Sequence, residues 1–307
     1  MDEFGIIAKY FAPLAGEGAF GLTDDVAVLP RRAGHELVVT TDAIVEGVDF
    51  FGFDPAGTIA RKALRVNLSD LAAKGAEPVH YLLNLSLPHS VTPDWLAGFS
   101  DGLAQDQKQY GVTLLGGDTG ATDGPLSISI TAFGFVPDGR MIRRSGARVG
   151  DHVYVTGTVG DSGGGLAIFR REAHNLSDAD RDALVSRYRV PEPPVAFAAT
   201  LRNIAHASVD VSDGLVADLG HIASASGVRI AVDGEQVPLS APLRALWDEG
   251  ALLRAVVAGD DYQIAFTALP GLTGPFTPIG RVVAGEGVSL NVKGQEIAVP
   301  KPGYRHF

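Results

Sequence analysis

Cysteine is absent from the 307 residues of this sequence. Its absence excludes disulfide bonds, thiolate metal sites and cysteine nucleophiles. A bound metal ion would have to be held by oxygen or histidine ligands. Three histidines, His80, His152 and His206, lie beside or within apolar runs, but no metal-binding spacing links them. We therefore expect them to be core or surface residues rather than ligands.

Positive charge is scarce as well. The chain has 25 Lys and Arg against 36 Asp and Glu, which gives a net charge of −11. Because nucleic acids and anionic membranes are bound by clustered Lys and Arg, we expect neither of them as a partner. An acidic chain that binds anionic substrates needs cations to neutralise them.

Long hydrophobic runs are missing too. None approaches the length of about 18 residues that a transmembrane helix needs, and the opening residues MDEFGIIAKYF lack the layout of a signal peptide. These absences lead us to expect a soluble protein of the cytoplasm. The 46% of hydrophobic residues and the 38 glycines favour two compact α/β domains with tight loops.

Capping residues and glycines mark the ends of several predicted helices. Asp54-Pro55 and Thr92-Pro93 suit helix starts, and Gly75 and Gly111 suit helix ends. The first half therefore predicts helices at 55–74 and 93–110, with strands at 27–30, 36–45, 80–87, 112–117 and 126–136. The second half predicts helices at 163–172, 178–187, 194–204 and 214–226, with strands at 151–156, 207–212, 228–232, 262–267 and 277–283. Because the pattern pauses in glycines and charges at 144–151, we divide the domains there, into 1–147 and 148–307.

Familiar nucleotide-binding motifs are also missing. The sequence has no GxxxxGK[ST] P-loop, no strand-bound GxGxxG and no protein-kinase catalytic loop. GDSGGG at 160–165 is similar to the nucleophile segment of chymotrypsin-type proteases. The mixed α/β pattern and the following LAIFRR favour instead a glycine turn that opens a helix. The N–H groups of such a turn could face an anion.

The sequence does contain a set of aspartates that follow or interrupt apolar runs. Asp70 is the most informative, because Asn67, Ser69 and Asp70 interrupt the apolar face of a predicted helix. Burying a carboxylate is costly unless a cation or several donors lie beside it. Any one of these aspartates alone is more simply a turn or cap residue, but together they suit Mg²⁺ ions that hold a polyphosphate. The set comprises Asp24, Asp25, Asp42, Asp70, Asp118, Asp210 and Asp213.

Several short motifs occur in a fixed order along the chain. They are TTDAIVEGVDF, NLSDLAAKGAEP, LLGGDT, VDVSDGLVADLGHI, GDDYQIAF and the terminal GYRHF. In this order they resemble the thiamine-monophosphate kinases, a family within the ATP-using superfamily that includes aminoimidazole ribonucleotide synthetase. The resemblance runs from EFGIIAKYF to Phe307. It implies a two-domain mixed α/β fold, a homodimer whose N-terminal domains share strands in a barrel, and MgATP and thiamine monophosphate held between the domains.

The resemblance also implies roles for individual residues. Asp42, Asp70, Asp210 and Arg144 would carry catalysis, with Arg144 as the phosphate clamp. The ligands of several Mg²⁺ ions would be Asp25, Thr40, Thr41, Asp42, Asp70, Asp118, Asp210 and Asp213. The ATP contacts would be Tyr110, Gly117, Asp118, Arg144 and Ser212, and the substrate contacts would be Asp49, Asp260 and Tyr304.

Some residues depart from the family pattern. Asp49 stands where we expect a histidine, Asp260 replaces a glutamate, and Gln263 replaces a second glutamate. These three lie on the substrate side. Thr23 also replaces a glycine before the pair of Asp24 and Asp25.

The implied reaction is the ATP-dependent phosphorylation of thiamine monophosphate to thiamine diphosphate. One alternative is an ATP-dependent enzyme of the same superfamily that acts on another small substrate. Lack of cysteine disfavours two such relatives, selenophosphate synthetase and the hydrogenase-maturation protein. The other alternative is a non-catalytic nucleotide sensor, which the presence of every predicted metal aspartate disfavours.

Overall fold

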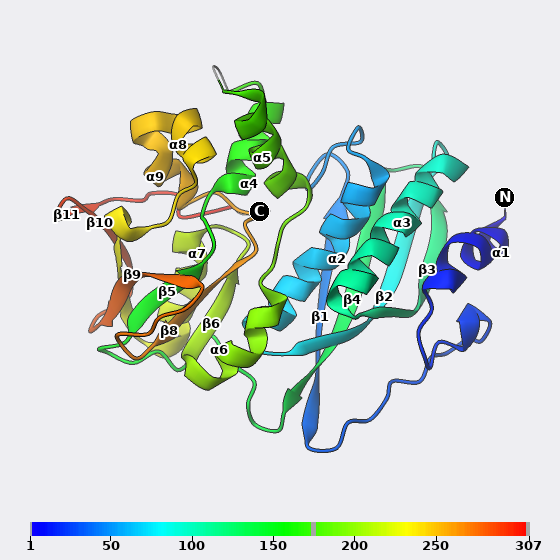
Figure 1. Ribbon diagram of the computed structural model, residues 1–307, viewed down its shortest axis with the longest axis horizontal. Coiled ribbons are helices and arrows are strands. Elements are labelled where there is room, and N and C mark those ends of the chain that lie inside the picture. The colour runs from blue at the N-terminus through cyan, green and yellow to red at the C-terminus, as the bar shows by residue number, and fades with distance from the viewer. Residues whose placement is uncertain (1, 173–175, 305–307) are drawn as a thin grey trace. The chain divides into compact units, whose positions relative to one another are not determined.

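The computed structural model describes residues 2–172 and 176–304, so the last three residues of the GYRHF motif lie outside the described part. Two compact units make up the chain (Figure 1). One is formed by Met1–Leu71 and Ala76–Arg140, and the other by Ala72–Gly75 and Met141–Phe307. Within the described ranges, no helix combines the length and the apolar character needed to cross a membrane.

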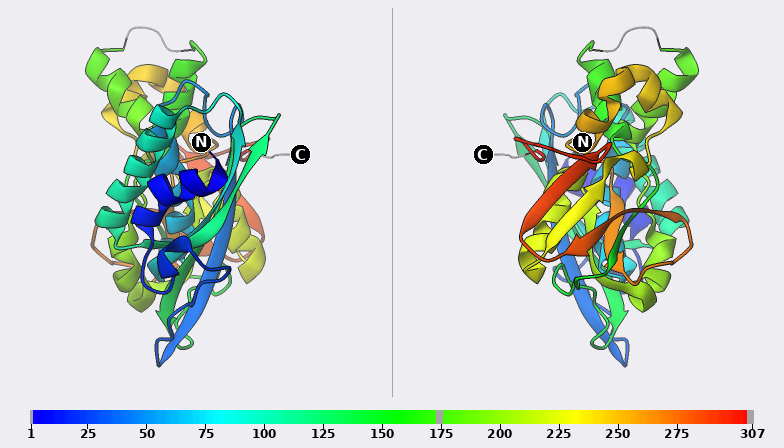
Figure 2. Two further views of the ribbon diagram at one scale, coloured as in Figure 1. Left: turned by 90° about the vertical axis from the view of Figure 1, so that its right-hand side faces the viewer. Right: turned by 90° about the vertical axis from the view of Figure 1, so that its left-hand side faces the viewer.

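The first unit is built on a mixed four-stranded sheet with the order β1-β4-β2-β3. Strand β4 pairs with β1 and β2 in antiparallel fashion, whereas β2 and β3 run parallel. Helices α2 and α3 lie on the same face of this sheet (Figures 1 and 2). The elements are β1 His35–Val45, α2 Ala56–Ala73, β2 Glu77–Pro88, α3 Pro93–Tyr110, β3 Thr113–Thr122 and β4 Ser127–Pro137. The last two residues of α2 belong to the second unit.

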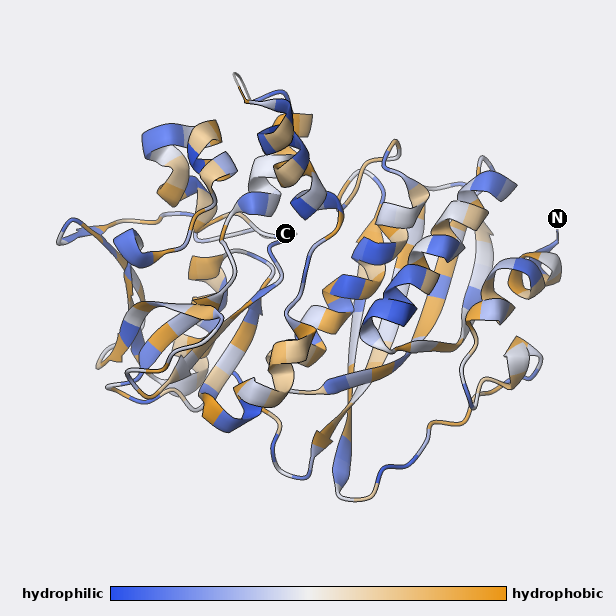
Figure 3. Cartoon of the chain, viewed as in Figure 1, coloured by the Kyte–Doolittle hydropathy of each residue, from blue (hydrophilic) through white to orange (hydrophobic). Residues whose placement is uncertain are grey.

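Helix α2 packs on the sheet through an apolar stripe. Hydrophilic and hydrophobic segments alternate along α2 and α3 in Figure 3. Leu64, Leu68 and Leu71 of α2 are at most 2% exposed, and their i, i+4, i+7 spacing places them on one helix face. The helix predicted at 55–74 is confirmed.

Helix α3 begins and ends as the sequence predicts. Thr92 Oγ1 accepts the backbone N–H of Trp95 at 3.2 Å, and Pro93 occupies the first helical position. Gly111 ends the helix with φ of +71°, a left-handed conformation that glycine adopts without steric cost.

Short helical segments and a long loop precede the sheet. They are α1 Glu3–Ile6, the π-helical η1 Ile7–Phe11, and the 3-10 turns η2 Ala12–Leu14 and η3 Phe20–Leu22. Residues 23–34 then form a loop, so the strand predicted at 27–30 is wrong. That run ends in a proline, which cannot donate to a β-ladder. Val28 within the run and Val26 just before it are both exposed.

The second unit contains a mixed seven-stranded sheet with the order β11-β10-β7-β9-β5-β8-β6, whose later strands appear in the right-hand view of Figure 2. Only the β7–β10 pair is parallel among the described pairs of this sheet. Helix α7 packs against β6 and β10. The strands are β5 His152–Thr156, β6 Ala205–Val211, β7 Arg229–Asp233, β8 Gln263–Ala268, β9 Phe276–Val283, β10 Gly287–Val292 and β11 Gln295–Ile297. The helices are α4 Asp161–Phe169, α5 Asp178–Arg189, α6 Ala198–Ile204, α7 Leu215–Ser226, α8 Ala241–Trp247 and α9 Ala251–Ala255, and the 3-10 turns are η4 Val195–Phe197, η5 Gly234–Gln236 and η6 Asp248–Gly250.

Every helix and strand predicted for the second half is confirmed, with ends shifted by a few residues. Helices α8 and α9 and strands β10 and β11 were not predicted. Helices α8 and α9 and strand β11, of seven, five and three residues, are too short for a helical or strand periodicity to show.

Candidate active site

Strand β1 and helix α2 bring three predicted metal ligands together in the first unit. Thr40 Oγ1 donates a hydrogen bond of 2.5 Å to Asp70 Oδ2, and Asn67 Oδ1 accepts the backbone N–H of Asp42 at 3.0 Å. Thr40 and Asp42 are two residues apart on a strand, so both side chains point to the same face. The polar interruption of α2 is therefore where the helix meets the strand. We call Thr40, Asp42 and Asp70 the β1–α2 cluster.

Negative charge is concentrated in the β1–α2 cluster. Desolvation, and after it the charges of Asp70 and Asp49, raise the pKa of Asp42 to about 6. Part of Asp42 is still open to solvent, so a ligand can reach it. Carboxylates that repel one another are stabilised by a cation, and a set of oxygen donors is what Mg²⁺ prefers.

Two other predicted metal ligands, Thr41 and Asp25, lie outside the β1–α2 cluster. Thr41 points to the opposite face of β1, where its Oγ1 donates to Ile130 O and accepts from Thr131 Oγ1, both at 3.1 Å. Asp25 is exposed in the loop after η3, and its backbone N–H donates to Asp24 Oδ1 at 2.8 Å. The structure thus does not bring the Thr41 and Asp25 side chains into the β1–α2 cluster.

Strand β3 carries two predicted ATP contacts. Gly117 has φ of +152°, and a Cβ at this position would lie 1.7 Å from Leu83 O on β2. Only glycine therefore fits. Asp118 follows it, exposed and opposite Asn84.

A buried ion pair joins α2 and α3 beside the third predicted ATP contact, Tyr110. Arg65 Nε and Nη2 donate to the Asp106 carboxylate at 2.7 and 2.8 Å, and Arg61 Nε donates to the same carboxylate at 3.0 Å. Arg65 and Asp106 are 1% and 0% exposed. The Arg65 guanidinium lies 5.1 Å from the centroid of the Tyr110 ring, a cation–π contact. This ion pair was not predicted, although an aspartate on the apolar face of a helix was the available signal.

Asp49, a predicted substrate contact, closes the turn that ends β1. Its Oδ2 accepts the backbone N–H of Val45 at 2.8 Å. Its backbone oxygen accepts a hydrogen bond from Lys62 Nζ at 2.8 Å, and Lys62 is 1% exposed. The carboxylate at this position therefore stabilises the local turn.

In the second unit, the end of β6 and the loop before α7 carry two predicted metal ligands, Asp210 and Asp213, and one predicted ATP contact, Ser212. Asp210 lies near the end of β6 and is 4% exposed. The backbone N–H groups of Ser212, Asp213 and Gly214 all donate to Asp218 Oδ2, at 3.0, 3.1 and 3.1 Å. Desolvation and the charge of Asp213 raise the pKa of Asp218 to about 7, although the three N–H donors oppose this shift. We call residues 212–214 the β6–α7 loop; Asp218 was not predicted.

Two distant segments dock on the β6–α7 loop through backbone hydrogen bonds. The N–H of Asp260 donates to Ser212 O at 2.8 Å, and the N–H of Tyr304 donates to Asp213 O at 2.9 Å. A Cβ at Gly303 would lie 2.5 Å from Asp213 O, which explains the glycine before Tyr304. The loop thus brings two predicted substrate contacts beside two predicted ATP and metal contacts.

The GDDY segment has an unusual backbone. Asp260 and Tyr262 have φ of +68° and +51°, a conformation that costs energy in residues other than glycine and recurs at functional sites. Tyr262 Oη donates to Asp260 Oδ1 at 3.1 Å. Gln263, one of the departures from the family pattern, is 4% exposed and accepts a hydrogen bond from Thr156 Oγ1 at 2.9 Å. The Gln263 side chain is therefore buried beside the sheet.

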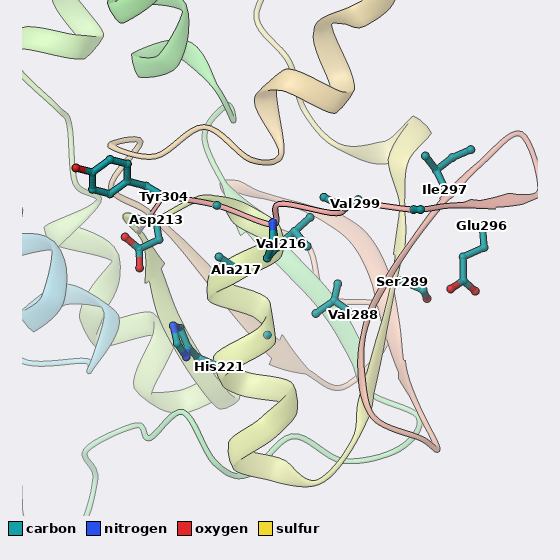
Figure 4. A pocket seen from close by; sticks show the side chains of 14 residues that line it. Asp213, Val216, Ala217, His221, Val288, Ser289, Glu296, Ile297, Val299 and Tyr304 are labelled. Carbon is teal, nitrogen blue, oxygen red and sulfur yellow. The ribbon is translucent and has the colours of Figure 1, made fainter. Parts of the chain in front are cut away.

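A pocket of about 550 Å³ adjoins the β6–α7 loop, between α7, β10 and the C-terminal segment. Asp213 and Tyr304 lie at one end of it, and Ser289, Glu296 and Ile297 lie at the other (Figure 4). The pocket gives a small molecule room beside two of the predicted site residues.

Arg144 lies exposed in the segment before β5. Ser226, the last residue of α7, holds this segment by hydrogen bonds. Its Oγ accepts the N–H groups of Gly146 and Ala147 at 3.1 and 3.2 Å. It also donates to Arg144 O at 3.4 Å. The backbone of Arg144 is thereby anchored, while its side chain remains at the surface.

The GDSGGG segment opens α4, as predicted, and two of its N–H groups bind a side chain of the protein itself. The N–H groups of Gly160 and Ser162 donate to the Asp261 carboxylate at 2.5 and 3.3 Å. Asp261 and Ser162 are 2% and 1% exposed. The side chain of a buried aspartate therefore occupies the helix start. A buried Ser162 is also unsuited to the role of a protease nucleophile.

Two of the three histidines make local contacts. His80 Nδ1 lies 2.9 Å from Thr113 Oγ1, and burial lowers the pKa of His80. His206 Nδ1 lies 2.9 Å from Asp151 Oδ2. These contacts agree with structural roles.

Comparisons with known proteins match both units. The chain matches the N-terminal domain of AIR synthase related proteins over residues 23–136 and the C-terminal domain over 148–293. It is 43% identical to the thiamine-monophosphate kinase of Caulobacter vibrioides, over 99% of this chain and 90% of that one. The crystal structure of thiamine-monophosphate kinase from Stenotrophomonas maltophilia superposes with a TM-score of 0.83 at 42% identity, over 90% of this chain and 91% of that one. The structure of AaThiL complexed with AMPPCP and TMP gives a TM-score of 0.83 at 32% identity, over 99% and 97% of the two chains.

These matches cover nearly the whole chain and confirm the expected two-domain mixed α/β fold. They also confirm the resemblance carried by the ordered motifs. The chain belongs to the thiamine-monophosphate kinase family.

Proposed function

We propose that this protein transfers the γ-phosphoryl group of ATP to the phosphate of thiamine monophosphate, giving thiamine diphosphate and ADP. The observation that carries this proposal is the high identity to thiamine-monophosphate kinases over nearly the whole chain. A similar structure holds AMPPCP, an ATP analogue, together with TMP, and these two ligands correspond to the donor and the acceptor of this reaction.

The donor atoms of the site suit Mg²⁺. Oxygen atoms make up the β1–α2 cluster, and the raised pKa of Asp42 reflects crowded negative charge that a cation would relieve. Bound Mg²⁺ would neutralise phosphate charge and orient the reacting groups. The proposed ligands are Thr40, Asp42, Asp70 and Asp118 in the first unit and Asp210 and Asp213 in the second. Asp25 and Thr41 are proposed as well, although their side chains lie outside the β1–α2 cluster.

The remaining proposed residues bind the two substrates. Gly117 lets the β3 backbone lie close to Leu83 of β2, because no side chain fits there, and it is a proposed ATP contact. The exposed Arg144 can pair with phosphate oxygens in a bidentate geometry. Tyr110 and Ser212 complete the proposed ATP contacts, and Asp49, Asp260 and Tyr304 are the proposed substrate contacts.

The transfer needs no general base. A phosphate monoester has a second pKa of about 6, so the acceptor is already an anionic nucleophile at neutral pH. The residues of the site therefore act by holding donor and acceptor in line and by excluding wrong orientations. We expect direct transfer, with inversion at a chiral γ-phosphorus and no phosphoenzyme.

We further propose that residues 1–147 form an ATP-binding and dimerisation domain and that 148–307 form a second domain, in a cytoplasmic homodimer. Strand β1 is an edge of its sheet, and Leu37 and Val39 on it are 44% and 62% exposed. An exposed apolar edge strand favours pairing with another chain. Light scattering coupled to gel filtration tests the dimer.

The reaction is tested by incubating the protein with MgATP and thiamine monophosphate and separating the products by chromatography. Free thiamine as acceptor and a sample without Mg²⁺ serve as controls. The variants Asp70→Asn and Asp210→Asn should lose most activity at saturating Mg²⁺. Asp101→Asn, an exposed position on α3, is the matched control and should retain it.

The outcomes separate this proposal from its alternatives. Thiamine diphosphate that forms only with Mg²⁺, and from the monophosphate only, supports it. MgATP binding without any product would indicate another acceptor, and binding without turnover on any acceptor would indicate a sensor.

A further inference from the structure

One buried carboxylate holds the β6–α7 loop. Asp218 is 2% exposed, and its Oδ2 accepts the backbone N–H groups of Ser212, Asp213 and Gly214. Gly214 is the N-cap residue of α7, with φ of +127°, and it has no side chain with which to cap the helix. The start of a helix leaves N–H groups without intrahelical partners. Asp218, from inside the first turn, accepts the N–H of Gly214 and those of the two residues before it.

The carbonyl groups of the same loop are fixed from the other side. Ser212 O accepts from Asp260, and Asp213 O accepts from Tyr304. Each of these loop residues is therefore bonded both through its N–H and through its C=O. A change in the orientation of the loop would break bonds to Asp218 or to the two docked segments.

We propose that Asp218 is a positioning residue for phosphoryl transfer, which fixes the β6–α7 loop and with it the orientation of Ser212, Asp213, Asp260 and Tyr304. This inference rests on the proposed function. In it, Asp218 touches neither substrate, because the residue is 2% exposed and its Oδ2 accepts three backbone N–H groups. Its effect on the reaction passes through the loop.

The test compares Asp218→Ala and Asp218→Asn with the control Ile222→Val. Ile222 lies one turn further along α7 and is fully buried, so its truncation lowers stability without removing a bond to the loop. Three properties are measured: amide hydrogen exchange of the peptide covering 209–223 in the nucleotide-free protein, MgATP affinity by calorimetry without acceptor, and kcat and KM with thiamine monophosphate. Thermal unfolding midpoints show how much stability each variant has lost.

We expect Asp218→Ala to speed exchange at 212–214 and to lower kcat, each by about tenfold or more, and to weaken MgATP binding. Asp218→Asn should recover part of each property, because its carbonyl oxygen can accept the same N–H groups. It also keeps the test valid where the alanine variant does not fold. Ile222→Val should lower the midpoint and leave kcat and MgATP affinity near those of the wild type.

Two results would overturn the inference. One is unchanged exchange at 212–214 in both Asp218 variants. The other is faster exchange with kcat and MgATP affinity no worse than in Ile222→Val. A wild-type protein that makes no thiamine diphosphate would refute the proposed function instead, and the exchange and MgATP affinity of the Asp218 variants would still decide the role of the carboxylate.

Discussion

Replacing Asp106 with alanine should cost the first unit a large part of its stability. The carboxylate is fully buried and accepts three hydrogen bonds from Arg65 and Arg61. Asp106→Ala leaves the buried Arg65 guanidinium without its counter-charge, and breaking a buried pair in this way costs about 3–5 kcal/mol. Thermal unfolding should show a midpoint lower by about 10 °C. The KM for ATP should rise as well, because Arg65 packs against Tyr110.

Two controls decide whether the ion pair is the cause. Asp101→Ala removes an exposed aspartate from the same helix and should change stability by at most about 0.5 kcal/mol. Replacing both partners, in Arg65→Met with Asp106→Leu, should recover most of the loss, because no unpaired charge is then buried. A loss below about 1 kcal/mol for Asp106→Ala would refute the reasoning.

Three further perturbations test other parts of the structure. Gly117→Ala should abolish kinase activity, because the added Cβ would lie 1.7 Å from Leu83 O. The unfolding midpoint of the second unit should not change, and normal turnover in a product assay would contradict the prediction. Desolvation raises the pKa of Asp261 to about 8, against about 3.9 in an unfolded chain. The folded state therefore keeps a proton that the unfolded state releases, so stability falls as pH rises from about 4 to about 8, and urea unfolding should show a flatter profile for Asp261→Asn. Asp49→Asn keeps an acceptor for the Val45 N–H but removes the charge of a proposed substrate contact, so the KM for thiamine monophosphate should rise by about fivefold or more. A KM within about twofold of the wild type would show that the carboxylate serves only the turn.

Local signals in the sequence predicted the elements that carry the site. Caps and an apolar stripe predicted α2 and α3, and the polar interruption of α2 by Asp70 predicted a contact that the structure shows with Thr40. The strand predicted at 27–30 is wrong because a strand needs a partner, which a short run ending in proline does not attract. Pairings between distant segments, such as Asp260 with Ser212, leave no local periodicity and cannot be derived from sequence alone.

Two buried acids were not predicted for the same reason: their partners lie in segments that the local sequence does not identify. Asp218 and Asp106 both interrupt apolar helix faces, as Asp70 does, so the signal was present. Their partners are a set of backbone N–H groups and an arginine on another helix. Neither partner can be identified before the fold is known.

The docking of the GDDY segment and of the C-terminal segment on the β6–α7 loop has an evolutionary consequence. Backbone atoms make these bonds, so exchanging the side chain of Asp260 or Tyr304 leaves the bond itself in place. The side chains of these two proposed substrate contacts can therefore change during divergence while their main chains keep their positions. The aspartate at position 260 can thus be exchanged without loss of the bond that holds its backbone to Ser212.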